Sequence, residues 1–136
     1  MYMLDTNICI YIINKKSLNV LEQLNKNLGK GLYISAITLA ELECGLENSL
    51  IENSLYKEKN RIALVEFLII MNIVYFDDNA AREFGIIKKS SIDRNDFVGL
   101  YNMLIGAHAK SLNMTLVTNN LSEFERIEGL KLENWV

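Results

Sequence analysis

Short apolar runs alternate along the chain with longer segments in which apolar residues recur every three or four positions. The first run, residues 1–4, has the length of a buried strand and ends abruptly at three small polar residues, Asp5, Thr6 and Asn7. We expect strands at 1–4, 32–34, 73–76, 115–118 and 130–135. We expect helices at 7–14, 18–28, 37–45, 55–71, from 77 onward, at 101–109 and at 121–126, with a polar break at 48–53 and a polar loop at 90–99.

This alternation of strands and helices predicts the fold class. Strands separated by helices over the whole length favour right-handed crossovers and a mainly parallel sheet with helices on both faces. A chain of 136 residues has the size of one domain. We therefore expect a single α/β domain over residues 1–136, with three layers. In its longest helix, the spacing predicts that Ile62, Val65, Leu68 and Ile69 face the core.

Composition narrows the class of protein. Half of the residues are hydrophobic and 23% are charged, which is a globular balance. The net charge is −3 and the isoelectric point is about 5.2, so nucleic acid must be bound through local clusters such as Lys15 and Lys16 or Lys88 and Lys89. No run suits a membrane span or a signal peptide, which favours a cytoplasmic protein. The two cysteines, Cys9 and Cys44, lie in apolar segments and are expected to be buried free thiols.

Polar residues gather where the predicted strands end. Asp5, Ser35 and residues 118–120 follow three strands, and Glu41 and Asn102 come early in two of the helices behind them. Because parallel strands end at one edge of a sheet, these side chains are predicted to meet there, where α/β folds bind ligands. Taken singly, each has a simpler explanation, since Asp5 or Thr6 can cap a helix and Glu41 can be a solvated surface residue.

Carboxylates that converge without histidine or thiolate neighbours suit a hard cation such as Mg²⁺ or Mn²⁺. Such an ion is most useful for hydrolysing a phosphodiester, because it orients a water and offsets charge on the phosphate. The residues predicted to be catalytic and to hold the metal are Asp5, Glu41 and Asn102, and those predicted to orient them are Thr6, Asn7, Thr118 and Asn120.

Other kinds of site have little support. His108 is the only histidine and lies in an apolar run, which favours a buried structural role over a ligand role. Zinc would need several histidine or cysteine ligands, and none cluster in the sequence. The glycine-rich phosphate-binding motifs are absent as well.

Four motifs together carry a family resemblance. They are residues 3–7 (MLDTN), 34–42 (ISAITLAEL), 104–109 (LIGAHA) and 116–126 (LVTNNLSEFER), in that order. The whole chain, down to residues 133–135, resembles PIN-domain proteins and within them the VapC-type toxins of bacterial toxin–antitoxin pairs. The resemblance implies a Mg²⁺-dependent endoribonuclease, usually a homodimer, that is held silent by a small VapB-type antitoxin and in some cases joins it in a higher-order complex. Asp5 and Glu41 fall on the family's acidic metal-binding and catalytic positions, and Asn120 falls where many PIN domains have a further Asp.

One residue departs from the family pattern. The family has an Asp in the first turn of the helix where this chain has Asn102. Asn keeps the size and one carbonyl oxygen, but it has no negative charge and its NH₂ group is a donor that a cation repels. The sequence therefore predicts a toxin weakened or inactivated at this position. The intact rest of the motif favours a deliberate or recent change over a naturally weakened member.

Two alternatives remain from the sequence. The chain could be a non-catalytic PIN-like module that binds only its antitoxin or RNA, with Asn102 as the mark of lost activity. It could also be a phosphatase with Asp5 as a covalent nucleophile, although that class of enzyme has a second Asp two residues later and this chain has Asn7.

Overall fold

The computed structural model describes residues 1–48 and 54–136, and the side chains of these residues except 54–56. The predicted polar break at 48–53 lies, apart from Asn48, outside the described residues. The five strands are β1 (Tyr2–Leu4), β2 (Leu32–Ser35), β3 (Asn72–Val74), β4 (Thr115–Val117) and β5 (Lys131–Glu133). They form one sheet in the order β3-β2-β1-β4-β5, and every neighbouring pair is parallel.

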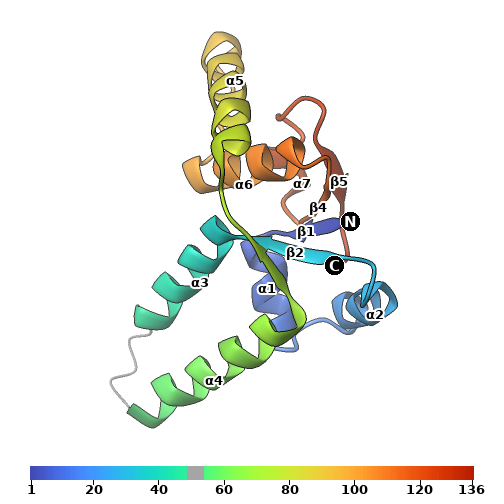
Figure 1. Cartoon of the computed structure of the whole chain (residues 1–136), viewed down its shortest axis with the longest axis vertical. Helices are drawn as coiled ribbons and strands as arrows, with labels where there is room; N and C mark the ends of the chain where they lie inside the picture. The colour runs from blue at the N-terminus through green and yellow to red at the C-terminus, as the bar shows by residue number, and fades with distance from the viewer. Residues whose placement is uncertain (49–53) are drawn as a thin grey trace.

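Seven helices are found in the described part of the chain. They are α1 (Thr6–Ile13), α2 (Leu18–Asn27), α3 (Ala36–Glu47), α4 (Ser54–Ile70), α5 (Asp78–Arg94), α6 (Leu100–Ser111) and α7 (Leu121–Phe124). Figure 1 shows α1 to α4 on one side of the sheet and α5, α6 and α7 on the other. The three-layer α/β fold predicted from the sequence is confirmed. None of these helices combines the length and the apolar content that crossing a membrane would need.

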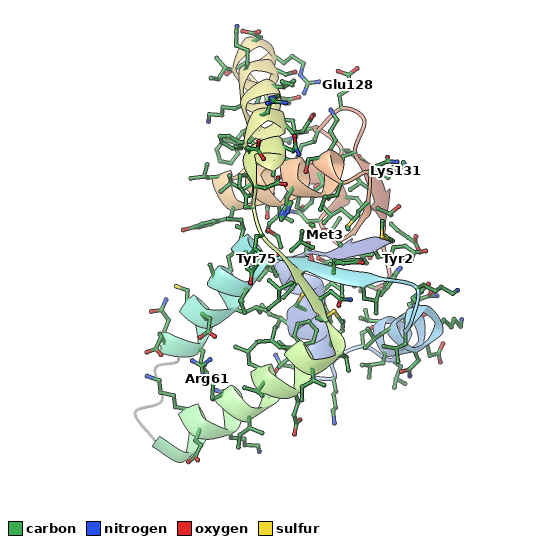
Figure 2. All side chains as sticks on the ribbon, viewed as in Figure 1. Tyr2, Met3, Arg61, Tyr75, Glu128 and Lys131 are labelled. Carbon is green, nitrogen blue, oxygen red and sulfur yellow. The ribbon has the colours of Figure 1, made fainter. Side chains whose placement is uncertain are left out.

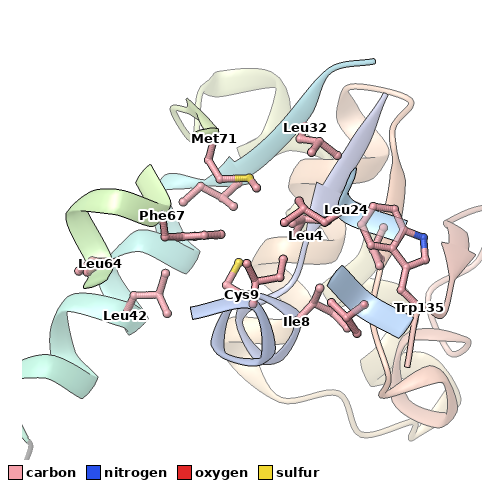
Figure 3. Close-up of a cluster of buried hydrophobic side chains, with 14 of the residues drawn as sticks. Leu4, Ile8, Cys9, Leu24, Leu32, Leu42, Leu64, Phe67, Met71 and Trp135 are labelled. Carbon is pink, nitrogen blue, oxygen red and sulfur yellow. The ribbon is translucent and has the colours of Figure 1, made fainter. Parts of the chain in front are cut away.

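Two separate hydrophobic clusters stabilise the two faces of the sheet. Successive side chains of a strand point to opposite faces, so Leu4 joins the cluster under α1 to α4 and Met3 joins the one under α5 and α6. Figure 3 shows the first cluster, in which Phe67 and Trp135 pack around the side chain of Leu4. Because both faces are covered, the central strands are apolar at almost every position, as parallel sheets require.

The face that α4 turns toward the core differs from the prediction. Of the four residues predicted to face the core, Leu68 packs against it, whereas Ile62, Val65 and Ile69 are exposed. The buried residues of the helix are Leu64 and Phe67. The helix is apolar nearly all the way round from residue 62 to residue 70, so the spacing alone does not select a face. Leu64 and Phe67 share the core cluster with Leu42 and Leu46 of α3, and this packing sets the rotation. At the surface of the two helices, Arg61 donates to Glu43 Oε1 at 2.7 Å (Figure 2).

Two further expectations from the sequence are wrong in detail. The predicted loop at 90–99 shrinks to 95–99, because α5 continues to Arg94 and ends where Asn95 adopts the left-handed conformation, with φ of 53°. Cys9 is a buried free thiol as expected, but the free thiol of Cys44 is exposed on α3. His108 is fully buried in α6, as predicted, and its Nδ1 shares a hydrogen bond of 2.8 Å with Ser35 Oγ.

Candidate active site at the carboxyl edge of the sheet

Asp5 lies at the point where β1 ends and α1 begins, and it is only 3% exposed. Its Oδ1 accepts a hydrogen bond of 2.9 Å from the backbone N–H of Ile8, which caps α1. Its Oδ2 accepts a 2.5 Å hydrogen bond from the Thr118 hydroxyl, which follows the neighbouring strand β4. The helix-cap role and the site role are therefore compatible, because each uses a different oxygen of the same carboxylate.

Burial gives the Asp5 carboxyl an unusual pKa. Loss of hydration disfavours the charged form and raises the pKa above its ordinary value of 3.8, and the nearby charge of Glu41 raises it further. The hydrogen bonds from Thr118 and from the backbone N–H groups of Ile8 and Asn7 act in the opposite direction, and the burial effect is the largest. A cation beside this carboxylate would offset both the lost hydration and the repulsion.

Glu41 reaches the same edge from the second turn of α3. That helix begins where β2 ends, because Ser35 Oγ caps it by accepting a 3.0 Å hydrogen bond from the backbone N–H of Ile37. The Thr6 hydroxyl donates to Glu41 Oε1 at 2.6 Å, so the residue after Asp5 holds the second carboxylate. We call Asp5 and Glu41 the carboxylate pair.

On the other side of the site, three polar side chains bind one another. Glu123 Oε1 accepts a 2.5 Å hydrogen bond from the backbone N–H of Gly99, and its Oε2 accepts one of 2.7 Å from the side-chain amide of Asn120. The side-chain amide of Asn102 also donates to this carboxylate. These hydrogen bonds lower the pKa of Glu123 and outweigh its partial burial, which alone would raise that pKa. We call Asn102, Asn120 and Glu123 the amide cluster.

Thr118 connects the two groups. Its hydroxyl oxygen accepts a 2.9 Å hydrogen bond from the backbone N–H of Asn120, while its hydroxyl hydrogen is donated to Asp5. The turn that follows β4 therefore fixes Asp5 on one side and Asn120 on the other. Thr118 is fully buried, so this connection is protected from water.

The structure brings together most of the residues predicted from the sequence. Thr118 contacts Asp5, and Thr6 contacts Glu41, as expected of residues that orient a site. Asn7 is exposed, and the group that acts on Asp5 is its backbone N–H, so its predicted side-chain role has no support.

Asn102 contacts Glu123, a residue that the predicted site did not include. The sequence does contain a sign that Glu123 belongs to the site, because Glu123 lies in a short helix three residues after Asn120. Residues at that spacing lie on one face of a helix, so a role for Asn120 in the site implies that Glu123 is close to it.

The donor atoms fit a hard cation in kind but are few in number. The carboxylate pair and the side-chain carbonyl of Asn102 offer oxygen ligands, which suit Mg²⁺ or Mn²⁺. In the described part of the chain, no three Asp, Glu, His or Cys side chains are placed so that they could hold a metal ion together. Asn102 accounts for part of this low number of ligands, because an amide stands where a carboxylate could be. Its NH₂ group donates a hydrogen bond to Glu123.

Comparisons with known proteins identify the family of this chain. Residues 2–130 match the PIN domain family. The chain is 42% identical to ribonuclease VapC2 of Haemophilus influenzae, over 99% of this chain and 98% of that protein. It is 38% identical to the tRNA(fMet)-specific endonuclease VapC of Shigella flexneri, over 98% and 97% of the two chains.

Solved structures give the same result. The fold superposes with a TM-score of 0.91 on a chain of the crystal structure of VapBC2 from Rickettsia felis bound to a promoter DNA fragment, at 38% identity and covering 99% of this chain and 98% of that one. The match to DNA-bound VapBC from Salmonella typhimurium has a TM-score of 0.90, at 38% identity and the same coverage. Sequence and fold together place this chain in the PIN-domain family, among the VapC ribonucleases.

Proposed function

We propose that this chain is the toxin of a type II toxin–antitoxin pair and an endoribonuclease that cleaves RNA with a divalent cation, Mg²⁺ or Mn²⁺. The observation that carries the proposal is the carboxylate pair. Asp5 is buried beside Glu41, hydroxyl groups hold both side chains in place, and the two meet at the ligand-binding edge of the sheet. A buried carboxyl group whose pKa is raised beside a second carboxylate is the kind of group found at functional sites, and relatives of this chain are named as VapC ribonucleases and endonucleases.

In this proposal Asp5 and Glu41 hold the cation, with the carbonyl oxygen of Asn102 as a weak third ligand. The bound ion would supply an activated water and neutralise charge that develops on the phosphate. The chain's own residues do the positioning. Thr118 and the N–H of Ile8 fix the two oxygens of Asp5, and Thr6 fixes Glu41, so the ligands need little reorganisation before the reaction.

Asn102 is expected to make the chain as given a slow or inactive enzyme. An Asp at this position would add a negative charge to the metal site. Two unit charges about 4 Å apart interact by about 4 kcal/mol at an effective dielectric near 20. Even a loss of about 2.7 kcal/mol in the transition state corresponds to cleavage about a hundredfold slower.

The structure also offers a surface for the antitoxin. An apolar groove of about 270 Å³ runs between α1, α3 and α4, with Glu41 in its lining. Its apolar walls are formed by Ile10, Ile13, Leu42, Leu46 and Leu64. From the sequence, the leucines of α2 and the long helix α4 are expected to form such a groove. In the structure the groove is lined by α1, α3 and α4, and α2 is not part of its lining. An amphipathic antitoxin segment would bury its apolar face here and bring a basic side chain to Glu41.

This partner assignment rests on the VapBC complexes among the structural relatives. We further propose that the toxin acts as a homodimer in the cytoplasm, where RNA is available, and that it joins its antitoxin there. If hydrogen exchange in a copurified complex were protected only around α5 and α6, the groove between α1, α3 and α4 would not be the binding site.

The decisive experiment compares the chain as given with an Asn102→Asp variant on total RNA, by sequencing the RNA ends that each produces with and without Mg²⁺. We expect the variant to generate new ends that require the cation. Titration calorimetry with Mg²⁺ tests the same site without activity. If neither protein shows carboxylate-dependent Mg²⁺ binding, the chain is a non-catalytic module that binds antitoxin or RNA.

A further inference from the structure

A small recess next to the carboxylate pair has no role in the mechanism above. It lies between α3 and α6, holds about 160 Å³, and is lined by Ala40, Glu41, Cys44 and Tyr101. Ala40 and Cys44 are four residues apart on α3, so they lie one above the other on the same face of that helix. Because both side chains are small, they leave room in the recess that they share with Tyr101.

Tyr101, which lines the recess, is an aromatic residue with an unusually exposed side chain. Its side chain is 58% exposed, although it lies in the first turn of a helix whose residues from 105 to 109 are buried. It directly precedes Asn102, and it shares the recess with Glu41. An exposed aromatic side chain that lines a recess together with two small side chains and the proposed catalytic carboxylate is suited to bind a planar ligand.

The charges around the recess select among planar ligands. Glu41 lines it, Asp5 lies close to Glu41, and the described lining contains no basic side chain. A free anion would be repelled by these carboxylates. A nucleobase is neutral and has two apolar faces, and stacking on an aromatic ring tolerates any base.

We propose that Tyr101 is a substrate-binding residue on which the base next to the scissile phosphate stacks, with Ala40 and Cys44 on the other side of that base. This inference rests on the proposed RNA cleavage and adds to it the subsite for one nucleotide. With the base in the recess, the adjoining phosphate lies toward Glu41 and Asp5. The arrangement requires a base that is not paired in a duplex, so the preferred substrate is single-stranded RNA or a loop.

The kinetic test uses three variants in the Asn102→Asp background. Tyr101→Leu removes the ring, Tyr101→Phe keeps it, and Tyr75→Leu removes another tyrosine that is 80% exposed and follows β3 at the outer edge of the sheet (Figure 2). We expect Tyr101→Leu to raise the KM for a single-stranded RNA about tenfold to a hundredfold, with a smaller change in kcat. Tyr101→Phe is expected to have a KM well below that of Tyr101→Leu, because it keeps the ring, and Tyr75→Leu is expected to stay within about twofold of the background.

A second test does not depend on cleavage. The chain as given is irradiated with RNA that carries 5-iodouridine, and the cross-linked peptides are identified by mass spectrometry. We expect a cross-link at Tyr101 and none at Tyr75. The inference is overturned if Tyr101→Leu and Tyr75→Leu change KM equally, if only kcat changes, or if Tyr101→Leu alters the oligomeric state, which would make the recess a contact between copies of the chain.

The two tests separate this inference from the proposed function. RNA that cross-links at Tyr101 but is cleaved by neither protein would refute the nuclease proposal and leave the base-binding role in place. Cleavage by the Asn102→Asp protein, without a cross-link at Tyr101 and without an effect of Tyr101→Leu, would refute only the base-binding role. Absence of both RNA binding and cleavage would refute both.

Discussion

The two sides of the site satisfy their charges in different ways. In the carboxylate pair, Asp5 and Glu41 lie close together and receive hydrogen bonds from hydroxyl and backbone groups, yet the pKa of Asp5 remains raised. In the amide cluster, the single carboxylate of Glu123 receives three N–H donors, and its pKa is lowered. Asp5 therefore retains a need for a positive charge nearby, whereas the negative charge of Glu123 is already stabilised by hydrogen bonds within the protein.

This difference shows what one isosteric change at position 102 does. The Asn102 amide donates to Glu123, whereas an Asp there would repel Glu123 and add a fourth carboxylate to Asp5, Glu41 and Glu123. With Asn, the amide cluster is stable without an ion, and with Asp, both sides would need one. Variants on each side of the site test this contrast, beginning with the one that has the largest expected effect.

The largest effect is expected from Asp5→Asn in the Asn102→Asp background. Cleavage of RNA should fall about a hundredfold to a thousandfold, because a ligand charge at the reacting phosphate is lost. The fold should persist, since the Asn carbonyl can still accept the N–H of Ile8. The matched control is Glu43→Gln, which removes a charge from α3 that pairs with Arg61 on the surface. An equal loss in both variants would contradict the role of the carboxylate pair.

The second prediction concerns Asn102→Asp alone. Mg²⁺-dependent cleavage should become about a hundredfold faster than for the chain as given. The melting temperature without metal should fall, and Mg²⁺ should raise it more than in the parent, because the ion relieves the new repulsion near Glu123. Asn113→Asp, the same change at an exposed position before β4, is the control. If the parent already cleaves as fast as the variant, Asn102 does not belong to the metal site.

A third variant, Glu123→Gln, tests the amide cluster from its other side. The Gln amide would direct an NH₂ group at the donors of Gly99 or Asn120, which now bind a carboxylate. We expect the free energy of unfolding to fall by about 1 to 2 kcal/mol, as measured by urea denaturation. Glu125→Gln, an exposed neighbour, serves as the control. Unchanged stability would mean that the hydrogen bonds to Glu123 do not stabilise the fold.

The smallest effect lies outside both groups, at His108. Burial lowers its pKa, and Asp77 and the backbone of Tyr75 only partly oppose this effect. The folded state thus favours the neutral ring, so the stabilisation is complete above the ordinary pKa of 6.5 and is lost as the pH falls toward the lowered value. The parent should therefore lose stability relative to His108→Gln on acidification from pH 7. A difference in unfolding free energy between the parent and His108→Gln that is the same at every pH would contradict this assignment.

Several features follow from the sequence because local chemistry determines them. The apolar run before Asp5 specifies a buried strand, and Ser35 specifies the cap that starts α3. The order of strands and helices then requires a parallel sheet, which collects Asp5, Glu41 and residues 118–120 at one edge. The departure at position 102 is also visible in the sequence, but only through the resemblance to the PIN-domain family, which has an Asp there.

Other features were decided only by the tertiary structure. The rotation of α4 could not be predicted, because a helix that is apolar all round is oriented by its contacts with α1 and α3 and not by its own spacing. The partner of Asn102 was hidden because Glu123 lies 21 residues further along the chain, and only the close approach of α6 and α7 joins them. The recess beside Tyr101 likewise exists only because α3 presents Ala40 and Cys44, two small side chains, where α6 begins.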